Sequence, residues 1–363
     1  MWVWNPLARR GFLAGGLAVT AAGVCGVPAA AVRRPGVAAP SISSTSDWGA
    51  REASGAIEVL DSAPDKIVVH HTATPNSEDT SQEQAFALAQ QVQEYHMDSN
   101  GWVDTGQNFT NSRGGYLLEG RHQSLAALES GSQHVVGAHA GEQNSVSLGI
   151  ENEGTYSQAE VPAALWESLV ELCSYMVGQY GIGAGEIYGH RDFMSTACPG
   201  DVLYARLPEL REAVAAAVGG VAVDPVVWPL VRGGSRGPVV SALQWLLRSG
   251  GAEVPVDGVF DARTGRATAG VRGGSASCFA TRVAEPDVFG GRDWARLAPV
   301  VSGGSGAAVR AVQVLLTWRG FAVGEQGRFD RRTASSVREF QASVGVAVSG
   351  VVDEGTWLRL LAR

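Results

Sequence analysis

The residues most able to carry chemistry in this 363-residue chain are its seven histidines, which all lie between residues 70 and 190. His190 is followed eight positions later by Cys198, so one loop can bring both side chains to the same metal ion. His70 ends a short apolar run and is well placed to supply a third ligand. Two imidazoles and a thiolate, with the fourth position open, form the tetrahedral site typical of catalytic zinc. The spacing therefore predicts a Zn²⁺ site on His70, His190 and Cys198.

The elements that must position these residues are predicted over residues 47–219. Short apolar runs predict strands at residues 66–70, 108–112, 116–119, 146–151 and 186–189. Helical patterns, the first opened by a capping box of Thr80 and Glu83, predict helices at residues 80–100, 162–180 and 200–218. Strands that alternate with helices predict an α/β fold in which helices pack on a central sheet.

The first 31 residues predict an export signal. Arg9-Arg10 precede a short apolar stretch rich in glycine and alanine, and Ala29-Ala30-Ala31 offers a cleavage site. The arginine pair is typical of twin-arginine signals, which export folded proteins. A membrane anchor is the alternative, but the stretch is short and is interrupted by glycines and by Pro28. We expect a secreted protein whose mature chain has no membrane span.

Charge and cysteine content narrow the class of protein further. The net charge of −8, with no run of basic residues, excludes a general nucleic-acid binder. If Cys25 leaves with the signal, Cys173, Cys198 and Cys278 remain, an odd number in an oxidising compartment. At least one cysteine must then have a role outside a disulfide, as a metal ligand does. Cys173 lies inside a predicted helix and is expected in the core.

Beyond residue 219 the chain repeats itself. Residues 234–244 are echoed by residues 304–313, and residues 257–264 by residues 326–333. The first copy is degenerate after Ala269, where it lacks an equivalent of Phe340-Gln341. The predicted organisation is an export signal at 1–31, a linker at 32–46, the histidine-containing domain at 47–219, a linker at 220–230, the degenerate copy at 231–298 and the second copy at 299–363.

The histidine-containing domain resembles the amidase-2 family, which includes zinc N-acetylmuramoyl-L-alanine amidases and animal peptidoglycan recognition proteins. The segments that carry the resemblance, in the family's order, are residues 47–51, 69–74, 101–109, 118–121, 147–151, 189–192 and 197–200. The resemblance implies a mixed central sheet with flanking helices and zinc on His70, His190 and Cys198. His71 should then face the other side of its strand. Both repeat copies resemble the three-helix peptidoglycan-binding domain, which implies two small helical bundles.

The resemblance also implies catalytic roles. Glu151 occupies the position of a general base, although it is alternatively a structural hydrogen-bond acceptor. His139 resembles a family histidine near the zinc, which either steadies the oxyanion or supports the site from behind. Thr196 stands where relatives carry a catalytic lysine or threonine. Gln107 departs from the pattern because many relatives carry tyrosine there, and losing the phenol removes one acid or oxyanion donor.

Substrate contacts are implied at four positions. Gly101 and Trp102 occupy the place of a Gly-Trp pair associated with stem peptides of the diaminopimelate type. Arg121 stands where an arginine pairs with the additional carboxylate of that residue, a geometry that suits a guanidinium. Gln107 borders the same site. A core tryptophan and a surface ion pair are the alternative interpretation of Trp102 and Arg121.

These observations together predict a zinc-dependent N-acetylmuramoyl-L-alanine amidase. Its partner is peptidoglycan or its muropeptides, the repeats anchor it to the wall, and we expect a monomer. Tethering raises the local substrate concentration without altering the active site. The alternative is a non-catalytic peptidoglycan recognition protein on the same fold. The retained Cys198 argues against that alternative, and Gln107 argues for it.

Overall fold

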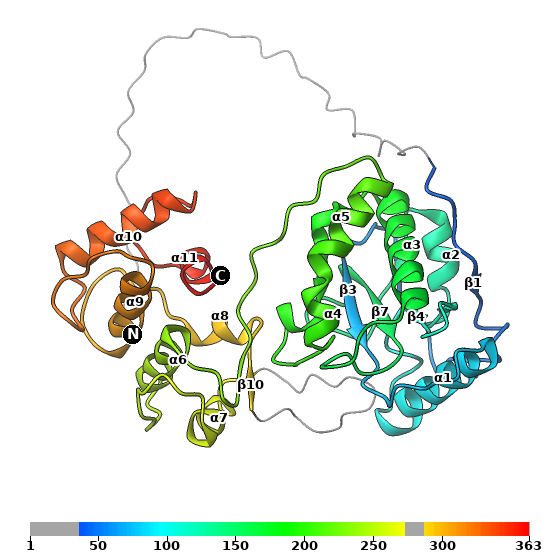
Figure 1. Cartoon of the computed structure of the whole chain (residues 1–363), viewed down its shortest axis with the longest axis horizontal. Helices are drawn as coiled ribbons and strands as arrows, with labels where there is room; N and C mark the ends of the chain where they lie inside the picture. Colours follow the sequence, from blue (N-terminus) through cyan, green and yellow to red (C-terminus); the bar gives the residue numbers. More distant parts are fainter. Residues whose placement is uncertain (1–35, 273–286, 363) are drawn as a thin grey trace, which may run out of the picture. The chain divides into compact units, whose positions relative to one another are not determined.

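The computed structural model describes residues 36–272 and 287–362 (Figure 1). Six strands form one mixed sheet in the order β1-β5-β4-β7-β3-β8. Their bounds are β1 Ile42–Ser43, β3 Lys66–His71, β4 Phe109–Asn111, β5 Leu117–Glu119, β7 Ser147–Asn152 and β8 Ile187–Gly189. All neighbouring strands are parallel except β4 and β5, which form an antiparallel hairpin. The predicted mixed central sheet is confirmed.

The two faces of this sheet differ because successive side chains of a strand point to opposite faces. On one face, apolar residues join a single core with α3 (Ala163–Tyr180) and α5 (Leu207–Ala217). The strand residues in this core include Ile67, Val69, Phe109, Leu148 and Ile150. The other face bears His70, Thr110 and Glu151, which are register partners near the C-terminal ends of parallel strands. Predicted site residues therefore occupy the face away from the main core.

The first helix, α1 (Gln82–Glu94), begins one residue later than the capping pattern predicts. The hydroxyl of Ser81, not that of Thr80, accepts the capping backbone hydrogen bond, at 3.2 Å. The helix continues into a π-helical turn at Tyr95–Ser99. Gly101 follows with a φ of +70°, a left-handed conformation that glycine adopts without strain.

The C-terminal helical pattern of this domain is two helices rather than one. α4 (Asp201–Ala205) ends before α5 begins, and Pro208 lies in the first turn of α5. Proline is tolerated there but breaks a helix interior, because it lacks an N–H and clashes with the preceding turn. The sequence patterns miss several short elements of this domain, namely α2 Ser124–Ser130, β2 Val59–Leu60, β6 His134–Val135 and β1 Ile42–Ser43. The last of these lies in the predicted linker at residues 32–46 but pairs with β5 as a strand of the central sheet.

The repeat region is mainly helical, and side chains from both copies belong to one hydrophobic cluster. Its elements are β9 Val231–Arg232, α6 Pro238–Ser249, α7 Ala262–Thr268, β10 Val288–Phe289, α8 Asp293–Leu297, α9 Ala307–Trp318, α10 Arg331–Ser343 and α11 Glu354–Leu361. The last helix of each copy is attached in the same way. Nε1 of Trp294 donates to the Pro229 carbonyl, and Nε1 of Trp357 donates to the Pro299 carbonyl, both at 2.8 Å.

At three places in the repeat region, a glutamine side chain closes a loop. Each side-chain oxygen accepts a hydrogen bond from the backbone N–H of a glycine with positive φ. The pairs are Gln244 with Gly258 at 2.9 Å, Gln313 with Gly327 at 2.7 Å and Gln341 with Gly350 at 2.9 Å. An aspartate then caps the helix that follows, which explains why these residue types recur along the sequence.

Several predictions lie outside the described residues. They are the export signal at residues 1–31, Cys278, and the part of the first copy where the equivalent of Phe340-Gln341 is predicted to be lost. Over residues 36–272 and 287–362, no helix combines the length and hydropathy needed to span a membrane.

Candidate active site

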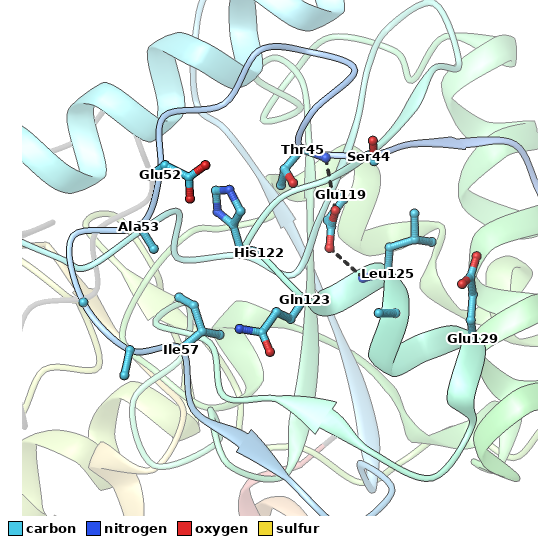
Figure 2. Close-up of a pocket in the computed structure, with 13 residues that line it drawn as sticks. Ser44, Thr45, Glu52, Ala53, Ile57, Glu119, His122, Gln123, Leu125 and Glu129 are labelled. Carbon is cyan, nitrogen blue, oxygen red and sulfur yellow. Dashed lines mark hydrogen bonds between the residues drawn. The ribbon is translucent and has the colours of Figure 1, made fainter.

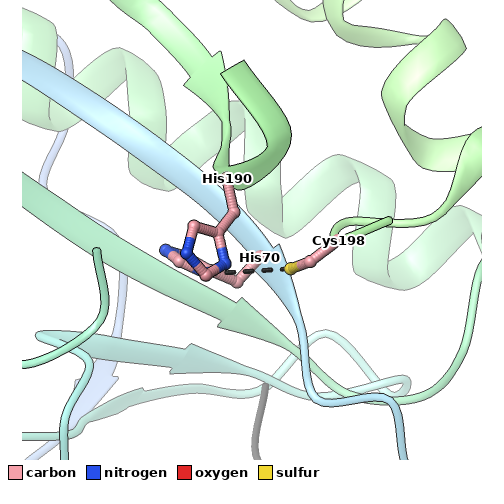
Figure 3. Close-up of side chains that lie close together, drawn as sticks. All are labelled: His70, His190 and Cys198. Carbon is pink, nitrogen blue, oxygen red and sulfur yellow. Dashed lines mark hydrogen bonds between the residues drawn. The ribbon is translucent and has the colours of Figure 1, made fainter. Parts of the chain in front are cut away.

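His70, His190 and Cys198 come together at the C-terminal ends of β3 and β8 (Figure 3). One ligand atom from each of them lies within 4.8 Å of the others, and all three residues are buried. His70 directs Nδ1 toward Sγ of Cys198, at 3.7 Å. The cis peptide bond between Cys198 and Pro199 belongs to the loop that carries the cysteine. The grouping predicted from spacing is therefore present in the fold.

The donor set fits a zinc ion. Nδ1 of His190 is buried and has no hydrogen-bond partner among the described residues, as expected for a nitrogen reserved for a metal. Burial lowers the pKa of His190 to about 3 and that of His70 well below its ordinary value, so both imidazoles are neutral and can ligate. Sγ of Cys198 accepts the backbone N–H of His71 at 3.4 Å, which favours a thiolate. Two nitrogens and one sulfur leave one position open, as catalytic zinc sites do.

His71 contributes nothing to this group from its side chain. Its Nδ1 accepts the backbone N–H of Tyr156 at 3.2 Å, and burial lowers its pKa to about 4. The neighbouring histidines thus have different partners, as the alternation of a strand requires.

His139 lies directly behind His70. Its Nδ1 is 3.1 Å from Nε2 of His70, and the two rings are nearly perpendicular. The ring packs on Gly149 of β7, where an added Cβ would lie 2.5 Å from the imidazole Cγ. The backbone N–H groups of His139 and Ala140 both donate to Oδ1 of Asn144 at 2.9 Å. The position of His139 is therefore set by its contacts with His70, Gly149 and Asn144.

Glu151 stands beside His70 on the same face of the sheet. It is 4% exposed, its Oε2 has no hydrogen-bond partner among the described residues, and burial raises its pKa to about 8. Glu153, two residues further along β7 and its loop, is engaged differently, because its carboxylate accepts the backbone N–H of Arg113 at 2.8 Å. Buried side-chain oxygens with a structural role normally have a donor, so the unpartnered Oε2 favours a functional role for Glu151 over the alternative of a structural acceptor.

Gln107 and Thr196 complete the surroundings of the site. Nε2 of Gln107 donates to Oγ1 of Thr110 at 2.9 Å, and Thr110 is the register partner of Glu151 on β4. The amide oxygen of Gln107 has no partner among the described residues. Oγ1 of Thr196 accepts the backbone N–H of Cys198 at 3.1 Å, so its own hydroxyl proton remains to be donated.

The predicted substrate residues form a second group. Trp102 stacks against His96 with ring centroids 4.7 Å apart, and Nη1 of Arg121 donates to the Thr105 carbonyl at 3.0 Å. Arg121 is only 8% exposed, so the alternative interpretation of this residue as part of a surface ion pair is wrong. Trp102 is partly buried rather than fully buried, as a core tryptophan would be. The Trp102 ring packs directly on Gly106, where an added Cβ would lie 2.5 Å from Cζ3 of the indole.

A pocket of about 620 Å³ lies beside β5 and α2 and shares no residue with either group (Figure 2). Glu119 and His122 are among the residues that line it. The Glu119 carboxylate accepts the backbone N–H groups of Thr45 and Leu125, and His122 pairs with buried Asp104 at 2.8 Å. These groups already have internal partners, so the pocket is explained by the packing of the loops around it.

Sequence reasoning missed two residues at these groups. Sδ of Met194 lies 3.3 Å from Nε2 of His190, and Nδ1 of His96 accepts the backbone N–H of Gly106 at 3.0 Å. The spacing of four between His190 and Met194 is the only signal that could have indicated the first contact. It would have required the short 3-10 helix at His190–Asp192 to be known.

Two parts of the chain match known protein families. Residues 60–201 match the N-acetylmuramoyl-L-alanine amidase family, and residues 305–360 match a peptidoglycan binding domain. Peptidoglycan-recognition protein SC2 of Drosophila melanogaster is 35% identical over 161 residues, which are 44% of this chain and 80% of the relative. The N-acetylmuramoyl-L-alanine amidase of Homo sapiens is 30% identical over 167 residues, 46% of this chain and 27% of the relative.

Among solved structures, that of Drosophila PGRP-LB shares 27% identity with a TM-score of 0.41, covering 46% of this chain and 92% of that one. The relatives are recognition proteins and amidases alike, so the family relationship gives the chain a role in peptidoglycan cleavage or recognition. The chain belongs to the family of peptidoglycan-recognition proteins and N-acetylmuramoyl-L-alanine amidases, and it carries a peptidoglycan-binding domain toward its C-terminus.

Proposed function

We propose that this chain is a zinc-dependent N-acetylmuramoyl-L-alanine amidase, which hydrolyses the amide between the lactyl group of muramic acid and L-alanine in peptidoglycan. The observation that carries the proposal is the cluster of His70, His190 and Cys198 on the sheet face that also bears Glu151. A complete donor set beside an available carboxylate supports hydrolysis rather than binding alone.

The residues around the cluster have different roles in the proposed reaction. A bound zinc ion supplies a Lewis acid, which polarises the scissile carbonyl and lowers the pKa of water. Burial alone raises the pKa of Glu151 to about 8, but a cation held at the neighbouring donors would favour the ionised carboxylate. In that form Glu151 would take the proton from the attacking water and deliver it to the leaving amine. Thr196 would donate a hydrogen bond from its hydroxyl to the carbonyl oxygen as negative charge develops there, and would keep its proton. His139 acts at the same centre through its contact with His70.

The group of predicted substrate residues around Trp102 and Arg121 would bind the stem peptide. Gly101 is exposed and Trp102 is partly buried, so both are able to contact a ligand. The backbone carbonyl of Gln107 accepts the N–H of Arg121 at 2.9 Å, and its side-chain amide donates to Thr110, the register partner of Glu151. Arg121 pairs with a stem carboxylate through the guanidinium N–H groups that Thr105 does not use. A buried guanidinium favours an anion strongly, because little water competes for it.

The remaining chain supports action at the wall. Residues 305–360 match a peptidoglycan binding domain, so the repeat region would hold the enzyme on its polymeric substrate. An exported monomer, with the signal at residues 1–31 and domain boundaries as predicted above, fits this role.

A non-catalytic recognition protein is the second candidate. The observation that favours it is Gln107, because an amide cannot provide the acidic proton of a tyrosine hydroxyl. Its binding surface would be the same second group, without turnover.

Digestion of purified peptidoglycan by the full chain, with and without a chelator, tests the proposal. New L-alanine amino termini that appear only when zinc is present would establish the amidase. A zinc-loaded protein that binds the wall but releases no such termini would instead be a recognition protein.

A further inference from the structure

Both imidazoles of the metal cluster present the same nitrogen. Nδ1 of His70 faces Cys198, and Nδ1 of His190 is the buried nitrogen without a partner among the described residues. In each ring Nε2 therefore points away from the cluster. Metal-ligating histidines normally donate that second N–H to a carboxylate, a backbone carbonyl or water, which fixes the tautomer and the ring orientation.

In this chain the two Nε2 atoms have other partners. His70 meets Nδ1 of His139 at 3.1 Å, and His190 meets Sδ of Met194 at 3.3 Å. We propose that His139 and Met194 are positioning residues that hold His70 and His190 with Nδ1 toward the metal. This inference rests on the proposed zinc site and names what orients it.

The His139 contact has a defined direction. A metal on Nδ1 of His70 leaves the proton of that ring on Nε2, so His70 donates and Nδ1 of His139 accepts. His139 then carries its own proton on Nε2. Its position is preset, because Gly149 leaves room for the ring and Asn144 holds the backbone on both sides of Cα.

The Met194 contact is set by the local backbone. The N–H groups of Phe193 and Met194 both donate to the His190 carbonyl, at 3.1 and 3.2 Å, and this tight turn brings the thioether back onto the ring. A thioether sulfur is a weak acceptor. The support of His190 is therefore weaker than that of His70, and the two ligands contribute unequally to metal retention.

Zinc affinity of the full-length protein tests this, measured by competition with a chromophoric chelator after metal removal. We expect His139→Ala to weaken zinc binding about 10- to 100-fold. His139→Gln should recover part of the loss, because its amide oxygen can accept from His70 without the imidazole. Met194→Leu keeps the volume and removes the sulfur, and should weaken binding by a smaller factor.

Met176 and His122 serve as controls, because they have the same residue types as Met194 and His139. Met176 is fully buried in α3, in the main core, and His122 pairs with Asp104 at the pocket of Figure 2. Met176→Leu and His122→Gln should bind zinc as the unchanged protein does. Imidazole ¹⁵N NMR of the zinc-loaded protein should show Nδ1 ligation and an Nε2 proton at both His70 and His190.

The outcomes separate this inference from the proposed function. A protein that binds zinc, with His139→Ala and Met194→Leu unchanged in affinity, overturns the positioning roles alone, as does ligation through Nε2. An unaltered protein that binds no zinc overturns the metal site and this inference together. Activity loss in these variants at full zinc occupancy would not count as support.

Discussion

His70 and Glu151 are register partners on the adjacent parallel strands β3 and β7, so their side chains leave the sheet on the same face. One belongs to the cluster of nitrogen and sulfur donors, and the other is a buried carboxylate with an available oxygen. The relationship is set by strand pairing rather than by a loop, which gives the site a rigid base.

Glu151→Gln should lower kcat by about 10²- to 10⁴-fold, because the amide keeps the shape but cannot accept the proton. Zinc content should remain at the level of the unchanged protein, since Glu151 is not one of the three donors. Glu153→Gln is the matched control, because that carboxylate serves Arg113 and should affect turnover little. Equal losses in both variants would contradict the base role.

Cys198→Ser should abolish stoichiometric zinc, because a serine hydroxyl is a far poorer zinc ligand than a thiolate. Cys173→Ala serves as the control, since that thiol lies in the core of α3 and is remote from the donors. Metal analysis by mass spectrometry reads the result directly. One zinc per chain in the serine variant would show that the donor set is wrong.

Gly149→Ala and Gly106→Ala should each affect a different group of the site, the metal donors or the predicted substrate residues. The first places a methyl 2.5 Å from Cγ of His139 and should reduce zinc affinity. The second places a methyl 2.5 Å from Cζ3 of Trp102 and should reduce muropeptide affinity while zinc affinity is kept. Calorimetric titration with each ligand distinguishes them. The reverse assignment of losses would refute this division.

His96 should make the zinc-free protein sensitive to acid. Burial, aided by the charge of Arg121 and opposed by Asp104, lowers its pKa to about 3 in the folded state, against 6.5 when unfolded. The unfolded chain therefore binds the proton first, and stability is lost as pH falls from 6.5 toward 3.

His96→Gln should remove up to about 1.4 kcal/mol per pH unit from this dependence, which is one proton. Its amide oxygen can replace Nδ1 as the acceptor for the Gly106 N–H. Urea unfolding between pH 4 and 7, with chelator present for both proteins, measures the slopes. Parallel slopes would mean that His96 is not the titrating group.

Truncation after Gly219 should leave activity on soluble muropeptides and weaken binding to intact sacculi. The buried residues of the core that contains α3 and α5 end at Val218, and those of the repeat region begin at Trp228, so the cut falls between the two sets. It removes Ala222, which packs on the first core, and Asp224, which pairs with Arg211 at 2.8 Å, so some loss of stability is expected as well. Pelleting with sacculi, beside turnover of a soluble fragment, gives both values. Undiminished sacculus binding would remove the anchoring role.

The sequence was sufficient for the donors and for the main strands. A buried strand that ends in histidine, and a histidine–cysteine loop, carry their own signals, so His70, His190 and Cys198 could be grouped without a fold. Glu151 needed the family resemblance, because nothing in a strand pattern says which neighbouring strand its side chain lies beside. That information is in the register of β3 with β7.

Other features could not be found in this way, for physical reasons. The contact of Met194 with His190 depends on a backbone turn of a few residues, which leaves no periodic trace. The helix expected over residues 200–218 is two helices, which are divided just before Pro208. The sequence did not predict the division, because the helical spacing of apolar residues continues through the break. The burial of Arg121 is likewise set by loops distant in sequence.

The equivalent attachments of Trp294 and Trp357 have a consequence for sequence change in the C-terminal region. Both copies close their ends onto a proline carbonyl by the same indole bond, although their middle segments differ in sequence. The same closure therefore serves two different sequences between its attachment points. Sequence changes between these points would leave both tryptophan attachments, and the cluster of His70, His190 and Cys198, as they are.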